Sequence, residues 1–508
     1  METSQKPAGQ TLPLTRKSNI FFQKLKKYVV LEKLYNPVGI GILILFSVFI
    51  ALGISKFGIL FGALFIVTVI SIPCVYAIVV YPKFGIIFLL IMAYMLFMLW
   101  RLGINGPVGI IMDVLQVLLI IGVIRRQRKE RNWAMLKGPI STMIIVWIIY
   151  NVLEVANPSA EARQAWLYTI RTVAVVMLSY FVFLYNIRTI KFVRLIFIVW
   201  LFMSTFAAIY GLKQEYIGFS DLEDAYLHSD PAIAGLLFIA GHWRKFSIFS
   251  DPVAFAYNMT MSTIFCIAII AGKFSRGKKI ICGILIFLFQ LSSLYSGTRG
   301  ANVLIPAALL LFAILNYNPA VLKATIVAAI FLVLLINVPT SNQNILRFQT
   351  AFRPNNDPSY LLRKANQKRI QPYIWTHPMG GGLGATGTWG QRFAPNSFLA
   401  NFPPDSGYIR VAVELGWIGL TIFCLLMFTA LKTGINNYYT IKDPELKTYC
   451  LAMTLIIFAY NIANFPQEAL VQFPSNVYFS LEMAMLTVLL RLDKEKQEQQ
   501  RNTSLISG

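Results

Sequence analysis

The chain has 508 residues, of which 57% are hydrophobic and 13% are charged. Soluble domains carry roughly 25% charged residues, so the composition excludes an ordinary soluble protein and indicates a membrane protein. The formal net charge is +23. Most of the positive charge lies in short segments between apolar runs, where membrane topology explains it, and nucleic acid is therefore not expected as a partner.

The chain begins with 36 basic and polar residues, followed by an apolar run without a small-residue cleavage pattern. We expect a retained first span and not a signal peptide. A helix needs about 20 apolar residues to cross a bilayer. The sequence predicts an all-α polytopic membrane protein with about fourteen spans, at 37–54, 57–81, 84–101, 107–124, 138–153, 165–186, 190–212, 253–272, 279–296, 301–316, 322–338, 409–432, 447–465 and 474–490.

Basic loops set the expected orientation. Residues 125–137 carry six Lys/Arg against one acid, and residues 273–279 carry four and no acid. With fourteen spans, both loops lie on the same side as the termini, which the positive-inside rule makes cytoplasmic. The chain then divides into a cytoplasmic tail at 1–36, spans one to seven at 37–212, an extracytoplasmic loop at 213–252, spans eight to eleven at 253–338, a large extracytoplasmic loop at 339–408, spans twelve to fourteen at 409–490 and a cytoplasmic tail at 491–508.

The large outer loop is rich in Gly, Pro, aromatic residues and Arg, so we expect it to be folded and functional. Arginines collect on this face, although topology does not require them there. Arg suits bidentate contact with phosphate, which indicates an anionic ligand at the membrane surface. Pairing with lipid headgroups or with outer acids is the alternative. The outer arginines are Arg244, Arg299, Arg347, Arg353, Arg363, Arg369, Arg392 and Arg410.

Three short motifs lie on the expected outer face. Ser296–Gly300 is a tight turn with glycines on both sides of Arg299, where the backbone can approach a ligand closely; the alternative is a plain hairpin turn. In Thr376–Gly384, consecutive glycines expose N–H groups that can bind an anion, or they form only a flexible loop. Asp405 stands just before a predicted span, where it could act as a general base or cap the helix.

Charged groups inside spans are functional hypotheses by default. Four qualify: Asp113, Arg171, Glu414 and Glu482. Polar pairing between helices is the alternative to a substrate role. The five cysteines lack C-x-x-C spacing, and the three histidines lack H-E-x-x-H spacing. We therefore expect no metal and no cofactor.

Taken together, these motifs resemble the O-antigen ligase/polymerase family of bacterial membrane glycosyltransferases, over residues 160–490 or so. Each segment is loose alone, but their order and their placement on one membrane face make the combination specific. The matching segments, in chain order, are Arg244 with Phe249–Pro252, then Ser296–Gly300, then Arg363 with Pro378–Gly384, and finally Asp405–Tyr408 with Glu414–Gly419.

The resemblance implies a metal-independent, inverting transfer of a glycan from a polyprenyl-diphosphate carrier to a hydroxyl of an acceptor glycan. Membrane lipids and a chain-length regulator are further expected partners. Under this hypothesis, Asp405 and Arg299 are catalytic, and His377 is a catalytic alternative that matches a structural position of the family. The expected substrate-binding residues are Arg244, Arg363, Arg369, Arg171, Glu414 and Tyr408.

Ligases of the family carry a histidine where this chain has Asp405, whereas polymerase-like members more often have an acid there. This favours a polymerase of O-antigen or exopolysaccharide in the bacterial inner membrane, with its active site on the extracytoplasmic side. Ligation of the glycan to lipid A core or to protein is the alternative within the enzyme class. A lipid-linked glycan transporter or flippase is the alternative of another class, although no internal repeat supports it.

Overall fold

The computed structural model describes residues 37–101, 109–239, 241–341, 343–352 and 358–507. The predicted basic tail and Arg353 lie outside the described residues. The chain divides into two compact units, residues 1–76 and 77–508. In the first unit, α2 (Pro37–Phe57) leads through Gly58 into α3 (Ile59–Val80). Gly58 has a φ of +75°, a conformation that glycine adopts without steric cost.

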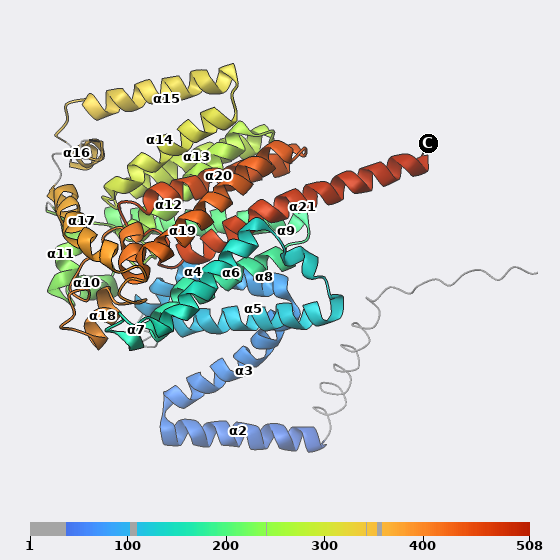
Figure 1. Ribbon diagram of the computed structural model, residues 1–508. Coiled ribbons are helices and arrows are strands. Elements are labelled where there is room, and N and C mark those ends of the chain that lie inside the picture. The colour runs from blue at the N-terminus through green and yellow to red at the C-terminus, as the bar shows by residue number, and fades with distance from the viewer. Residues whose placement is uncertain (1–36, 102–108, 240, 342, 353–357, 508) are drawn as a thin grey trace, which may run out of the picture. The chain divides into compact units, whose positions relative to one another are not determined.

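The second unit is built from helices and one small hairpin (Figure 1). A two-residue antiparallel pair, β1 (Phe238–Ile239) and β2 (His242–Trp243), is the sheet of the described residues. The helices are α4 (Pro82–Arg101), α5 (Gly109–Glu130), α6 (Pro139–Leu153), α7 (Arg163–Ile170), α8 (Ser179–Asn186), α9 (Ile190–Tyr216), α10 (Asp221–Leu227), α11 (Pro231–Leu237), α12 (Pro252–Ala271), α13 (Arg276–Leu294), α14 (Arg299–Leu315), α15 (Pro319–Asn337), α16 (Gln343–Thr350), α17 (Pro358–Thr376), α18 (Gly387–Phe393), α19 (Gly407–Thr440), α20 (Pro444–Ala463) and α21 (Ser475–Ser507).

Eight helical stretches of the described residues are long and apolar enough to cross a membrane, which confirms a helical membrane protein. Helices lie at all fourteen predicted positions, while the count of fourteen spans and their orientation stay predictions. The eight stretches are Pro82–Arg101, Pro139–Ala156, Arg163–Asn186, Ile190–Tyr216, Pro252–Ala271, Arg276–Leu294, Gly407–Thr440 and Pro444–Ala463.

Helices α12 and α20 form the centre of the second unit. They contact each other, and between them they contact α9, α13, α14, α19 and α21. In Figure 1, α20 lies beside α12 and beside α19, and it contacts both. Most of the apolar stretch of α12 is buried, whereas only 22% of the apolar stretch of α13 is buried. Because lipid tails are as apolar as leucine, the exposed face of α13 is suited to contact with lipid.

The two predicted outer loops contain secondary structure. Residues 213–252 hold α10, α11 and the hairpin, and the described part of residues 339–408 holds α16, α17 and α18. At the C-terminus, α21 continues to Ser507 through residues that the sequence placed in a polar tail. The helix outlasts its apolar stretch because the residues that follow, rich in Lys, Glu and Gln, are strong helix formers.

Candidate functional site

Arg244 and the turn that precedes α14 form one structure. The Arg244 Nε donates to the Ser296 carbonyl at 2.8 Å, and Nη2 donates to the Thr298 Oγ1 at 3.0 Å. Gly297, between these two residues, has a φ of +62°, which favours glycine. Arg244 therefore holds the turn whose next residue, Arg299, begins α14. Its predicted contact with substrate would act alongside this positioning role.

The start of α14 lies against two other segments. A Cβ added at Gly300 would lie 3.0 Å from the Tyr257 hydroxyl and 3.6 Å from Pro466. Tyr257 belongs to α12 and is buried, and Arg363 of α17 acts electrostatically on its hydroxyl. Two predicted site arginines, Arg299 and Arg363, are thus brought to the same part of the structure from different helices.

The glycine run after α17 docks on α19. The Gly381 N–H donates to the Val413 carbonyl and the Gly382 N–H to the Glu414 carbonyl, both at 2.9 Å. Gly416 interrupts the helical geometry of α19 with a φ of +67°, and a Cβ there would lie 1.9 Å from the Pro378 carbonyl oxygen. The N–H groups that the sequence offered to a ligand anion are therefore used by the chain itself.

The carboxylate of Glu414 completes this contact. It accepts from the Gly384 N–H at 3.0 Å, from the Thr386 hydroxyl and from the Arg410 Nε at 3.2 Å. The side chain is only 3% exposed. The glycine run does bind an anion, but that anion is Glu414, so the predicted contact of Glu414 with substrate would be indirect.

Arg410 joins two acids from different segments. Its Nε meets Glu414, and its Nη1 lies 2.5 Å from the Glu468 Oε2. Burial raises the pKa of the half-buried Glu468, and the Arg410 guanidinium opposes this shift. Glu468 lies in the linker between α20 and α21 (residues 464–474), which the sequence analysis did not single out. A single acid in a short linker on the predicted outer side, which also holds many arginines, is the signal that could have found it.

The α20–α21 linker also holds the segment that carries Asp405. The Gly407 N–H donates to the Asn464 carbonyl at 3.0 Å, and a Cβ at Gly407 would lie 2.0 Å from the Asn464 Oδ1. Asp405 is half-buried, and it acts electrostatically on Glu468. Among the residues that the structure describes, none donates a hydrogen bond to the Asp405 carboxylate, which leaves its oxygens available as proton acceptors.

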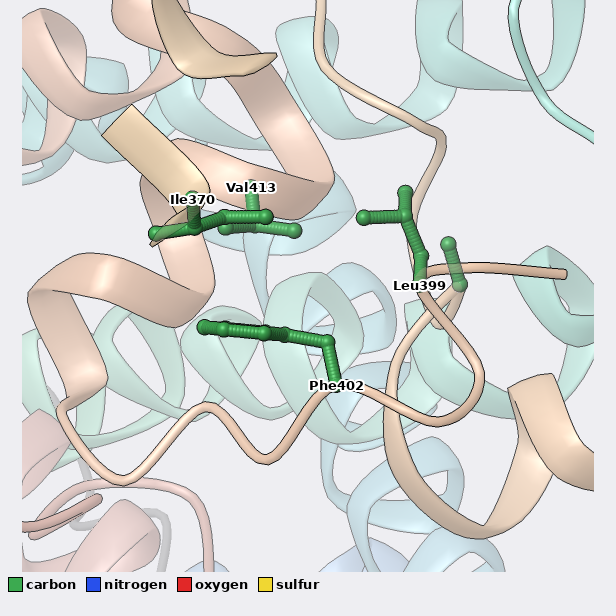
Figure 2. Packing of buried hydrophobic residues seen from close by; sticks show 5 residues of the cluster. Ile370, Leu399, Phe402 and Val413 are labelled. Carbon is green, nitrogen blue, oxygen red and sulfur yellow. The ribbon is translucent and has the colours of Figure 1, made fainter. Parts of the chain in front are cut away.

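A hydrophobic cluster joins α17, the segment before Asp405 and α19. Figure 2 shows Ile370, Leu399, Phe402 and Val413 packed together, and all four are buried. Ile370 lies seven residues after Arg363, which places both on one face of α17. The packing of Ile370 therefore fixes the direction in which Arg363 leaves the helix.

Three predicted site residues make contacts within the chain. The His377 Nδ1 lies 3.0 Å from the Tyr373 carbonyl, and the two rings stack at 3.9 Å, so His377 completes the end of α17. The Tyr408 hydroxyl donates to the Asn461 carbonyl at 3.1 Å and ties α19 to α20. Arg369 is exposed and lies over the Phe398 ring at 5.1 Å.

Two of the four charged groups inside helices pair with each other, which was the expected alternative to a substrate role. The Arg171 Nη1 lies 2.9 Å from the Asp113 Oδ2 and joins two helical segments. Arg171 begins a π-helical segment, Arg171–Val175, a geometry that is frequent at functional sites. Glu482 is fully buried, and no partner of its carboxyl is found among the described residues.

A pocket lies beside the Arg410–Glu414 pair. Its walls are mostly apolar and include Trp147, Phe423 and Leu470, and the π-helical segment contributes Thr172 and Val173. Among the described residues, no group of three or more His, Cys, Asp or Glu side chains could hold a metal ion. Arg410 is the basic residue among the described residues that line the pocket.

A comparison with known protein families finds a match. Residues 282–424 match the model of the O-antigen ligase family. Over these residues the chain is similar to that family. This match confirms the resemblance seen in the motifs, and the O-antigen ligase segment contains Arg299, Arg363 and Asp405. Arg244 and the α20–α21 linker lie outside the matched segment, and the fold shows that they lie beside it. No curated protein matched the chain in a sequence search.

Proposed function

We propose that the protein is a bacterial surface polysaccharide polymerase, for O-antigen or exopolysaccharide. It transfers a glycan from a polyprenyl-diphosphate carrier to a hydroxyl of an acceptor glycan at the extracytoplasmic face of the inner membrane. The family match supports a lipid-linked glycan and an acceptor as substrates. An acid at position 405, where ligases of the family have histidine, favours the polymerase over the ligase.

One observation carries the proposal. Gly300, next to Arg299, lies against Pro466 of the linker, and Asp405 is within electrostatic range of Glu468 of the same linker. Arg363 acts on Tyr257, whose hydroxyl also lies against Gly300. Transfer from a lipid diphosphate needs positive charge beside the leaving group and a proton acceptor beside the attacking hydroxyl. The linker region supplies both.

In the proposed step, the Asp405 carboxylate takes the proton of the acceptor hydroxyl. The hydroxyl oxygen forms a bond to the anomeric carbon, and the bond from that carbon to the diphosphate oxygen breaks with its electron pair on the diphosphate. Arg299 and Arg363 stabilise this negative charge as it develops. A positioned general base contributes typically ~10²–10⁴-fold to such a reaction.

Apart from His377, which completes the end of α17, the remaining predicted residues have three roles under this proposal. Arg244, Glu414 and Tyr408 act through contacts with the chain itself, because each holds a segment that carries a reacting group. Arg369 is exposed beside Phe398 and is placed to contact the glycan. Arg171 acts on the wall of the pocket through its pair with Asp113.

The experiment that tests the proposal is deletion of the gene, followed by separation of the glycans by size on a gel. We expect single repeat units on an otherwise normal acceptor, because only polymerisation is lost. Long polymer left on its carrier lipid beside a bare acceptor would instead identify a ligase. Complementation with the wild-type gene should restore the polymer. Complementation with Asp405→Asn supplies the protein without the proposed base, so it distinguishes loss of the reaction from loss of the protein.

A further inference from the structure

We propose that Glu468 is a positioning residue for the transfer reaction, which holds Arg410 away from Asp405. This inference rests on the proposed function, in which Asp405 accepts the proton. Glu468 lies outside the segment that matches the family model.

The contacts of Arg410 carry the first step. Arg410 follows Asp405 by five residues at the start of α19, and an unpaired guanidinium there could approach the Asp405 carboxylate. Instead, Nε is bound to Glu414 and Nη1 to Glu468. Glu414 is already held by the glycine run, so Glu468 is the acid that fixes the outer end of the guanidinium.

The charges carry the second step. One arginine between two carboxylates leaves a net charge of about −1 if both acids are ionised, and Asp405 adds another negative charge. Burial raises the pKa of Glu468, Arg410 acts against this shift, and Glu414 and Asp405 add to it. Arg410 is therefore the counter-charge of this cluster of acids, and Glu468 holds it on the side of the linker.

The backbone carries the third step. The Gly407 N–H is bound to the Asn464 carbonyl at the start of the linker. Four residues further along the linker, Glu468 binds Arg410 of α19. Between them, Pro466 lies against Gly300, next to Arg299. Loss of the Glu468 carboxylate would therefore release one side of the linker from α19 and also free Arg410 to pair with Asp405.

The test uses the purified full-length protein with a polyprenyl-diphosphate-linked glycan as donor and follows kcat, KM and the pH profile. In Glu468→Gln, we expect kcat to fall about tenfold, with little change in the KM for the donor. The acidic limb of the kcat profile should move to lower pH, because Arg410 loses its contact with Glu468 and can then pair with the Asp405 carboxylate. Glu468→Asp keeps the charge and should keep the limb in place, and it also provides a test if Glu468→Gln does not fold.

The matched control is Glu445→Gln, which removes an acid from another arginine pair. Glu445 binds Arg194 with two contacts of 2.6 Å between α9 and α20, at the predicted cytoplasmic ends of these helices. We expect its pH profile to equal that of the wild type. A Glu468→Gln profile that also equals the wild type, while Asp405→Asn is inactive, would overturn this inference alone. Full activity of Asp405→Asn would overturn the role of Asp405 in the proposed function.

Discussion

Gly416 offers the sharpest test of how the glycine run is held on α19. Its φ of +67° and ψ of −174° belong to a region that is essentially restricted to glycine. A Cβ there would lie 1.9 Å from the Pro378 carbonyl oxygen and 2.6 Å from the Gly380 nitrogen. Gly416→Ala therefore strains the backbone and pushes Pro378–Gly382 away from the helix.

The expected magnitude follows from these contacts. The strained backbone costs about 1–3 kcal/mol for a residue with a side chain. Displacement of the run also breaks the bonds from Gly381 to Val413 and from Gly382 to Glu414, each worth about 1 kcal/mol. We expect Gly416→Ala to lower the free energy of unfolding by about 3–5 kcal/mol.

The assay is unfolding of the purified protein in detergent, followed by tryptophan fluorescence, with transfer activity measured in parallel. Gly283→Ala in α13 is the matched control, because no atom lies within 4 Å of its added Cβ. Alanine is the better helix former by about 1 kcal/mol, so this control should be neutral or more stable. Equal unfolding of the two variants would refute the account of how the glycine run is held.

Three further predictions concern the reacting groups. Arg299→Ala should abolish polymer on a gel while leaving expression and folding intact, and Arg299→Lys should restore only part of the activity, because lysine lacks the bidentate fork; normal polymer from Arg299→Ala would contradict the diphosphate role. Asp405→Asn should lower kcat by ~10²–10⁴-fold without weakening donor binding in an equilibrium assay, and an equal loss of binding would indicate a structural turn. Arg244→Ala should lower thermal stability as well as activity, since it removes two hydrogen bonds from the turn; an unchanged melting temperature would argue against the positioning role.

The apolar runs predicted the positions of the helices because burial in lipid is a property of each segment alone. Helix ends were less predictable. α5 runs to Glu130 and α21 to Ser507, beyond their apolar stretches, because charged residues also favour helix once a helix has begun. The interruption of α19 at Gly416 depends on a partner segment and leaves little trace in hydropathy.

The motifs of the site could be predicted from the sequence, but the residues that bind them within the chain could not. Residue types and positive-inside counting placed Arg244, Arg299 and Asp405 on one expected face. That Arg244 binds the turn before Arg299, and that Glu414 receives the glycine run, are pairings between distant segments, which a single sequence does not encode in any local pattern. The bonds of the α20–α21 linker to Gly407 and Arg410 are pairings of the same kind.

The surroundings of the linker also favour one carboxylate as the base. Asp251 caps α12, and its Oδ1 accepts from two backbone N–H groups. Glu414 is bound by the glycine run and by Arg410, and Glu468 is bound by Arg410. A carboxylate whose oxygens are held by fixed donors is less accessible to the hydroxyl of an incoming acceptor glycan. Of these four acids, Asp405 alone has no donor among the described residues, so the proton acceptor expected from its sequence position is also the acid with open lone pairs.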